Sequence, residues 1–313
     1  MESNNYNNYF KSRKVLVTGG AGFIGSHLTQ HLVRLGASVH VLDDLSTGFR
    51  SNLSGYDIDF THGSILDPMA VRNAIHGCSH VFHEAAFVSV PDSFKKEAQC
   101  LNINVVGTGN VLLAASNEGC DRVVFASSAA CYGSNPPVPS KESVKSLAES
   151  PYAQSKSIGE QCMRDADVDT VSLRYFNVFG ERQNPKSQYA AVISAFTDAI
   201  MNNRKPIIFG DGTQSRDFTH VDNIVHANLL AASHPNQLEG DVFNVGTGTT
   251  LTLLDVLQIM VGHKELEIDF QPTRKGDVTE SCADIRKIID IFGYLPTKCT
   301  VDALRSLVNP KQH

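Results

Sequence analysis

The sequence predicts an α/β fold with a doubly wound parallel sheet and a smaller α/β lobe. In the first half of the chain, short apolar runs alternate with stretches whose apolar residues recur at helical spacing. Such alternation is typical of a parallel sheet with helices on both faces. At 313 residues, the chain is also long enough for a full hydrophobic core and two closely joined lobes.

A glycine-rich turn follows the first expected strand. Residues 15–17 are apolar, and Gly19, Gly22 and Gly25 then stand three apart before a stretch with apolar residues at helical spacing. Glycine lets the backbone turn tightly and approach a ligand closely, and a helix start presents unpaired N–H groups to an anion. The stretch therefore predicts a pyrophosphate site, the alternative being a glycine turn without a ligand.

An acidic residue ends the second expected strand. Residues 39–42 form this strand, and Asp43 follows it directly. A carboxylate at this place accepts hydrogen bonds from both hydroxyls of an adenosine ribose and repels a 2′-phosphate. We therefore expect NAD rather than NADP, with Ser64 and Ile65 beside the adenine.

The next elements continue the alternation. Asp67 precedes Pro68, which is typical of a helix cap followed by the first helical residue. Ala85 and Ala86 end a later strand and are small enough to let the backbone approach a cofactor. The further expected strands cover residues 58–61, 81–86 and 123–126, and a helix is expected over residues 102–117.

Hydroxyl side chains lie at the carboxyl end of the strand 123–126. Ser127 and Ser128 stand there, at the edge where open α/β sheets bind ligands. Tyr152 and Lys156 are four apart in a helix expected to begin at Pro151, so they share one face. This pair also occurs by chance, but the serines and the NAD pattern strengthen it.

Composition is typical of an ordinary globular protein. Hydrophobic residues make up 42% of the chain and charged residues 19%, with a net charge of −6 and no cluster of lysine or arginine. A nucleic-acid groove is therefore not expected. No apolar run approaches the roughly 20 residues that span a bilayer, so no membrane partner is expected either.

The N-terminal residues and the cysteines bear on where the protein is located and on its redox environment. Residues 1–13 are rich in Asn and Tyr and lack the apolar core of a signal peptide, so we expect a flexible or loosely docked lead. Seven scattered cysteines without a Cys-x-x-Cys pair favour reduced thiols in the cytoplasm and argue against structural zinc.

Four segments resemble one enzyme superfamily. They are residues 19–25, Ser128-x-x-x-Tyr132-Gly133, Tyr152-x-x-x-Lys156 and residues 173–180. They are similar to the extended short-chain dehydrogenase/reductases, with their Rossmann-like sheet, and specifically to the nucleotide-sugar 4-epimerases. Residues 83–91 and 174–191 are most similar to the UDP-N-acetylglucosamine 4-epimerase branch. The resemblance covers nearly the whole chain from Lys14 onward.

The resemblance implies a mechanism. Tyr152 is expected to be the general base and acid, with its pKa lowered by the Lys156 ammonium and by the positive nicotinamide ring. Lys156 would also hold the nicotinamide ribose, and Ser128 would bond the sugar O4. Hydride would pass from sugar C4 to NAD and return to the other face of a 4-keto sugar, so the cofactor stays bound.

Two alanines argue for epimerisation. Related dehydratases place an Asp-Glu pair directly after the strand-end hydroxyl residue, and decarboxylases place a Glu there. This chain has Ala129 and Ala130. Without an acid or base at this point, the resemblance implies that the ketone is simply reduced again.

The resemblance also assigns binding residues. The cofactor would contact Gly19, Gly22, Phe23, Ile24, Gly25, Asp43, Ser64, Ile65, Ala85, Ala86, Asn104, Tyr152, Lys156 and Tyr175. The UDP-sugar would contact Ser89, Ser128, Asn177, Ala191, Val192, Ile207, Phe209, Arg216, Arg274, Asp277 and Ser281. The two arginines suit a diphosphate because each donates paired hydrogen bonds in one plane, although either alone is as often a surface ion pair. Ser64 departs from the aspartate that is frequent in the family.

Ser281 bears on the choice of substrate. A bulky residue at the matching position excludes an N-acetyl group at C2 of the sugar, whereas a small one admits it. We therefore expect UDP-GlcNAc and UDP-GalNAc as substrates, with UDP-glucose and UDP-galactose also accepted. The alternatives are an epimerase of UDP-glucose and UDP-galactose only, a uronic acid epimerase, for which no cation facing C6 is visible, and a non-catalytic NAD-binding regulator.

Several other polar residues are interpreted as structural. His83 is expected to be a hydrogen-bonded core histidine, and Cys131 a packing residue. His220, Asp222 and His226 lie at an expected helix start, and no metal is expected there.

Two domains and a dimer complete the expectation. Residues 14–175 and 217–245 would form the NAD-binding domain, and residues 176–216 and 246–313 the lobe for the sugar nucleotide. Helices around residues 98–117 and 151–164 resemble those that pair into a four-helix homodimer interface in the family.

Overall fold

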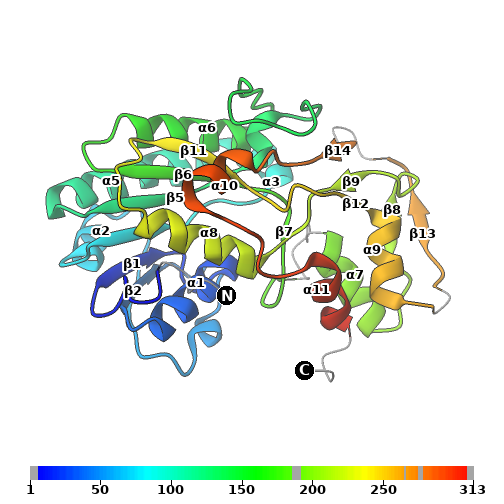
Figure 1. Ribbon diagram of the computed structural model, residues 1–313, viewed down its shortest axis with the longest axis horizontal. Helices are drawn as coiled ribbons and strands as arrows, with labels where there is room; N and C mark the ends of the chain where they lie inside the picture. The colour runs from blue at the N-terminus through cyan, green and yellow to red at the C-terminus, as the bar shows by residue number, and fades with distance from the viewer. Residues whose placement is uncertain (1–5, 185–191, 264–265, 274–277, 309–313) are drawn as a thin grey trace.

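A seven-stranded, all-parallel sheet forms the centre of the computed structural model, which describes residues 6–184, 192–263, 266–273 and 278–308 (Figure 1). In spatial order the strands are β11 (Asp241–Val245), β6 (Thr170–Tyr175), β5 (Arg122–Ser128), β4 (His80–His83), β1 (Lys14–Thr18), β2 (Ser38–Asp43) and β3 (Asp59–His62). The order reverses between β1 and β4, which makes a crevice at the carboxyl ends of these two strands. The predicted doubly wound sheet is confirmed.

Helices cover both faces of the sheet (Figure 1). One face packs against α1 (Phe23–Arg34), α8 (Val221–Ser233) and α10 (Arg286–Phe292) through buried apolar residues such as Leu28 and Ile224. The other face packs against α2 (Pro68–Ile75), α5 (Gly107–Glu118) and α6 (Pro151–Arg164) through residues such as Val71 and Val111. Both faces are therefore dry, as a parallel sheet requires.

Local sequence fixes where these helices begin. The Asp67 carboxylate accepts hydrogen bonds from the backbone N–H of Met69 and Ala70, and Pro68 is the first residue of α2, as predicted. Ser150 caps α6 in the same way, directly before Pro151.

A run of short helices leads into α5. These are α3 (Val90–Lys95), α4 (Glu97–Leu101) and a single π-turn, Asn102–Val106. The helix predicted over residues 102–117 is thus interrupted at its start by a wider turn. Single π-turns inside helices are frequent at functional sites. Two 3-10 turns, Arg50–Leu53 and Ala129–Tyr132, follow β2 and β5.

The second lobe has its own small core. Its helices are α7 (Val192–Met201), α9 (Leu253–Val261) and α11 (Thr300–Val308). Its strand pairs are β8 (Ile207–Phe209) with β13 (Asp269–Gln271), β9 (Ser215–Arg216) with both β12 (Leu251–Thr252) and β14 (Glu280–Ser281), and β7 (Val178–Phe179) with β10 (Thr219–His220). Phe196, Ile208, Leu257 and Leu304 are buried together between them.

The N-terminal lead differs from the expectation of a loosely docked segment. Phe10 is fully buried in the core of the sheet, and the Tyr6 hydroxyl bonds His226 Nδ1 at 2.9 Å. The Tyr9 hydroxyl bonds His80 Nε2 at 3.1 Å. The aromatic rings bury apolar area while their hydroxyls find partners, so residues 6–13 belong to the folded domain.

One C-terminal stretch also crosses the expected division of the lobes. Ile288, Phe292 and Tyr294 pack in the core beside β11 and α8, and the Tyr294 hydroxyl donates to the Gly246 carbonyl at 3.0 Å. Residues 286–294 therefore pack with the sheet rather than with the small lobe.

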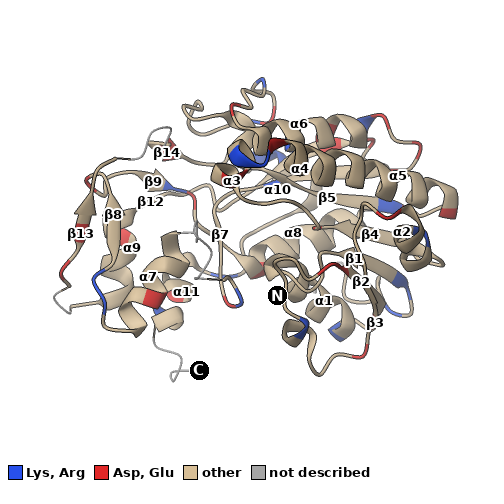
Figure 2. Cartoon of the chain, turned by 180° about the vertical axis from the view of Figure 1, so that it is seen from behind, with Lys and Arg blue, Asp and Glu red and all other residues tan. Residues whose placement is uncertain are grey.

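Basic and acidic residues are spread over both lobes (Figure 2). Among the helices of the described residues, none is long and apolar enough to cross a membrane.

Candidate active site

A cavity of about 1080 Å³ opens at the carboxyl edge of the sheet, and residues from both lobes line it. Its location matches the crevice between β1 and β4, where open α/β sheets bind ligands. All five residues assigned to the glycine turn, residues 19 and 22–25, lie on its wall.

The glycine turn is packed too closely for side chains. A Cβ at Gly25 would lie 2.3 Å from the Gly19 carbonyl oxygen, and Gly19 itself has a φ of +69°. The N-cap of α1 is Gly22, which has no side chain to cap the first turn, and residues 22–25 of this helix start line the cavity, so their N–H groups are available to a ligand there. This arrangement suits a bound pyrophosphate.

Asp43, Ser64 and Ile65 line the end of the cavity where the adenosine of NAD is expected. The Asp43 carboxylate accepts hydrogen bonds from the backbone N–H of Ala21 and of Leu45, both at 2.8 Å. Each carboxylate oxygen retains a second lone pair, which can accept a ribose hydroxyl. Ser64 and Ile65 line the same cavity, so the adenosine end fits the residues present.

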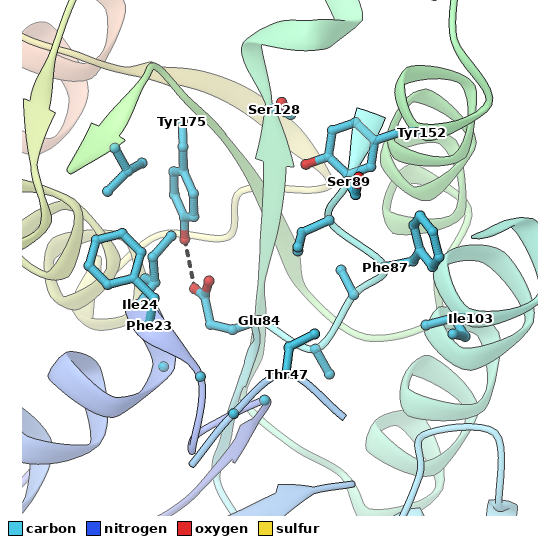
Figure 3. A pocket seen from close by; sticks show the side chains of 18 of the residues that line it. Phe23, Ile24, Thr47, Glu84, Phe87, Ser89, Ile103, Ser128, Tyr152 and Tyr175 are labelled. Atoms are coloured by element: carbon cyan, nitrogen blue, oxygen red, sulfur yellow. Dashed lines mark hydrogen bonds between the residues drawn. The ribbon is translucent and has the colours of Figure 1, made fainter. Parts of the chain in front are cut away.

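Tyr152 and Ser128 lie together on another wall (Figure 3). Ser128 is the last residue of β5, and its Oγ accepts the Ala130 N–H at 3.1 Å. Burial raises the pKa of Tyr152 to about 12, although a hydrogen bond with Ser128 acts in the opposite direction. Tyr152 and Ser128, both predicted as site residues, thus line the same cavity, and burial disfavours loss of the Tyr152 proton.

Lys156 lies on α6 near Tyr152 and points into the protein interior. Its Nζ is buried, donates to the Ala126 carbonyl at 2.7 Å and lies 6.0 Å from the centre of the Tyr152 ring. Burial lowers the pKa of Lys156 to about 8. Burial is the main cause of the raised pKa of Tyr152, and Lys156 does not line the cavity.

Asn104 lies behind the wall rather than on it. Its Oδ1 accepts the Phe87 N–H at 2.7 Å, and its Nδ2 donates to the Phe87 carbonyl and to Ser155 Oγ. Asn104 therefore braces the loop after β4, in which Ala85, Ala86 and Ser89 line the cavity.

Glu84 is a wall residue that sequence reasoning missed. Its carboxylate accepts a hydrogen bond from the Tyr175 hydroxyl at 2.7 Å (Figure 3). The Tyr175 oxygen in turn accepts a hydrogen bond from Asn228 Nδ2 at 2.8 Å. Its signal in the sequence was an acidic residue directly after a buried strand, at the edge where ligands bind.

The sugar-nucleotide residues divide into two groups. Asn177, Arg216 and Ser281 line the main cavity, and Ser281 pairs with Arg216 between β14 and β9. Arg216 Nη1 donates to the carbonyls of Ser215 and Thr279.

The second group lies elsewhere. Phe209 lines a second cavity of about 800 Å³ in the small lobe, which shares Val278 with the main cavity, and Val192 and Ile207 line neither. Ala191, Arg274 and Asp277 lie outside the described residues.

The residues interpreted as structural have structural contacts. His83 is buried and bonds the hydroxyls of Thr18 and Thr108, and Cys131 is buried. His220 caps α8, and His226 bonds Tyr6. Within the described ranges, no three His, Cys, Asp or Glu side chains form a group that could hold a metal ion.

Comparison with known proteins places this geometry in a family. The sequence model of the NAD dependent epimerase/dehydratase family matches residues 15–246. The chain belongs to this family. Its cofactor is therefore NAD, which agrees with the glycine turn and with Asp43.

Individual relatives match over nearly their whole length. A putative UDP-glucose 4-epimerase of Methanocaldococcus jannaschii is 36% identical over 304 residues, covering 94% of this chain and 97% of the relative. The solved UDP-N-acetylglucosamine 4-epimerase of Methanobrevibacter ruminantium, in complex with UDP-N-acetylmuramic acid, is 36% identical with a TM-score of 0.89, covering 96% of this chain and 98% of that one. The UDP-glucose 4-epimerase of Thermus thermophilus, solved with NAD, is 32% identical with a TM-score of 0.85, covering 95% and 98%.

Proposed function

We propose that the protein is a UDP-N-acetylglucosamine 4-epimerase, an isomerase that also accepts UDP-glucose and UDP-galactose. The observation that carries this proposal is the small Ser281 on the wall of the same cavity as Tyr152 and Ser128. The similarity to 4-epimerases of UDP-sugars, one of them specific in name for the acetylated sugar, supports it.

The chain's own residues suit proton transfer at the sugar O4. NAD, when bound here, would supply the acceptor and donor of hydride at C4. Ser128 would hold the O4 hydroxyl, and the Tyr152 oxygen would take its proton and later return it. Because burial raises the Tyr152 pKa to about 12, the base needs positive charge close by, which the Lys156 ammonium, 6.0 Å from the ring centre, and an oxidised nicotinamide would supply.

The wall beside Tyr152 favours epimerisation over elimination. Ala129 and Ala130 both line the cavity, and neither side chain can remove a proton from C5 of a 4-keto sugar. Glu84 also lines the cavity, but its carboxylate is engaged by Tyr175. These side chains support a ketone that is reduced again in place.

The size of Ser281 supports an acetylated sugar. Ser281 is buried on β14, directly across from Arg216 on β9, so a larger side chain here would enter the cavity. Arg216 would contact the diphosphate, and Asn177, whose Nδ2 donates to the Asp217 carbonyl, would lie beside it. A tyrosine at position 281 would take the space that an N-acetyl group needs.

An exposed apolar face supports a homodimer. Phe94, Val106, Leu113 and Ile158 are 63%, 52%, 65% and 42% exposed on α3, the π-turn, α5 and α6, which pack side by side. We infer that a second copy of the chain covers this face. Leu113→Glu should halve the mass measured by sedimentation, whereas Met69→Glu, at an equally exposed residue of α2, should leave it unchanged. A monomeric wild-type protein would contradict the dimer.

A second candidate is an epimerase of UDP-glucose and UDP-galactose only. The name of the Methanocaldococcus jannaschii relative favours it. The two candidates differ in whether Ser281 leaves room at C2 of the sugar.

The experiment measures conversion of UDP-GlcNAc and of UDP-glucose by wild type, Ser281→Tyr and the control Ser281→Ala, using proton NMR. We expect wild type and Ser281→Ala to convert both sugars, and Ser281→Tyr to keep only UDP-glucose. A Ser281→Tyr enzyme that still epimerised UDP-GlcNAc normally would refute the size argument. A wild type active on UDP-glucose alone would favour the second candidate.

A further inference from the structure

Glu84 is an acidic group in the catalytic half of the cavity. Asp43 and Asp44, which also line the cavity, lie at the carboxyl end of β2 beside the adenosine site, and Asp92 lines it from α3. Glu84 instead follows β4, and its charge acts on both Tyr152 and Lys156. Figure 3 shows it reaching from β4 towards Tyr175, with Tyr152 across the cavity.

The surroundings of Glu84 hold one carboxylate oxygen in place. Asn228 is completely buried on α8, and its Nδ2 donates to the Tyr175 oxygen. The hydroxyl proton of Tyr175 is thereby directed to Glu84 Oε1, at 2.7 Å. A chain of two hydrogen bonds from α8 through β6 thus fixes the carboxyl against the cavity wall.

Charge and burial compete at this carboxyl. Burial raises the pKa of Glu84 to about 7, while the Tyr175 hydrogen bond and the Lys156 ammonium act in the opposite direction. A buried carboxylate of this kind gains strongly from any additional positive charge that enters the site.

We propose that Glu84 sets the balance between oxidised and reduced cofactor, by placing a negative charge in the half of the cavity where Tyr152 lies. An oxidised nicotinamide ring carries a positive charge that the reduced ring lacks, so a nearby carboxylate stabilises NAD⁺ over NADH. Tyr175 and Asn228 are positioning residues that hold this carboxylate.

The Glu84 charge also bears on the return of hydride to the sugar. A 4-epimerase ends each cycle with hydride returned to the sugar and the cofactor oxidised. An anion that favours the oxidised form therefore favours return of the hydride over a stalled, reduced enzyme. This consequence rests on the proposed function, whereas the effect on the cofactor rests only on the NAD dependence of the family.

The test is a potentiometric titration of the bound cofactor in the holoenzyme, followed by the near-ultraviolet absorbance of reduced nicotinamide. It is made well above pH 7, so that the carboxyl is ionised. Glu84→Gln keeps an oxygen for the Tyr175 hydroxyl but removes the charge. We expect it to favour the reduced cofactor by about tenfold, which raises the midpoint potential by about 30 mV for a two-electron couple.

Three further variants separate charge from structure. Glu84→Asp keeps the charge and should keep a potential close to that of wild type. Tyr175→Phe removes the hydrogen bond but not the charge, so it should shift the potential much less than Glu84→Gln. Asp44→Asn removes a negative charge at the adenosine end of the cavity. Because the adenosine part of the cofactor is identical in NAD⁺ and NADH, this substitution should leave the potential unchanged.

Two results would overturn the proposal. One is a Glu84→Gln holoenzyme with the wild-type potential, and the other is an equal shift in Asp44→Asn or in Tyr175→Phe. Failure of the proposed function would show differently, as a protein that converts no UDP-sugar while the potentials still differ between the variants.

Discussion

Replacing Gly25 with alanine tests how the cofactor end of the cavity is built. The added Cβ would lie 2.3 Å from the Gly19 carbonyl oxygen and 2.9 Å from the Cα of Gly20, where ordinary contact begins at 3.4 Å. Both neighbours are backbone atoms, so the glycine turn and α1 must separate by about 1 Å. Overpacking of this kind costs about 1–3 kcal/mol of folding free energy.

The expected functional effect is larger than the effect on stability. The displacement takes backbone N–H groups away from the pyrophosphate, and a hydrogen bond to a charged group contributes about 1.5–3 kcal/mol. Gly25→Ala should therefore lose its bound NAD during purification and bind added NAD about 100-fold more weakly. Isothermal titration calorimetry measures this affinity, because the chain has no tryptophan to report on it. The control is Arg34→Ala, at the exposed last residue of α1, on the end of the helix away from the glycine turn. Gly25→Ala with wild-type NAD affinity and unfolding free energy would refute the role given to the turn.

Three further predictions concern the lead, the acid–base residue and a buried histidine. Phe10→Ala should lower the free energy of unfolding in urea by about 3–5 kcal/mol, because Phe10 is fully buried against Phe82 and His80. The control Lys11→Ala, at an exposed residue, should change this free energy by less than about 0.5 kcal/mol. Equal effects of the two substitutions would mean that the lead is only loosely docked. Tyr152→Phe should lower kcat by about 10²–10⁴-fold while NAD remains bound, and a retained kcat would remove Tyr152 from the mechanism. Burial lowers the pKa of His226 from 6.5 to about 4, so the unfolded chain binds more protons in this range and stability falls as pH falls. This group should cost about 2 kcal/mol at pH 5 relative to pH 7, measured as the change with pH in the difference between wild type and His226→Phe; a pH-independent difference would contradict the assigned shift.

The parts of the fold that local sequence determines could be predicted. The strand and glycine turn before α1, the acidic end of β2 at Asp43, and the cap of α2 at Asp67 each depend on residues close together in the chain. Tyr152 and Lys156 could be placed on one helix because their spacing matches the helical repeat.

The missed features depend on contacts between distant residues. Tyr175 and Glu84 are 91 positions apart, and Tyr6 and His226 are 220 apart. A local sequence pattern therefore cannot predict the hydrogen bond within either pair. Spacing placed Lys156 on the right face of α6, but only the packing shows that its ammonium reaches the Ala126 carbonyl. Burial then raises the pKa of Tyr152, and the degree of burial cannot be predicted from composition or from the motif.

The most direct measurement of the central claim follows a deuterium label at C4 of UDP-GlcNAc. The purified holoenzyme is incubated in ordinary water without added cofactor, and the product is analysed by NMR. If hydride is held by bound NAD and returned while Tyr152 moves only the O4 proton, UDP-GalNAc forms with its deuterium still at C4. Loss of the label to solvent during inversion, or no inversion of UDP-GlcNAc at all, would contradict this account of the site.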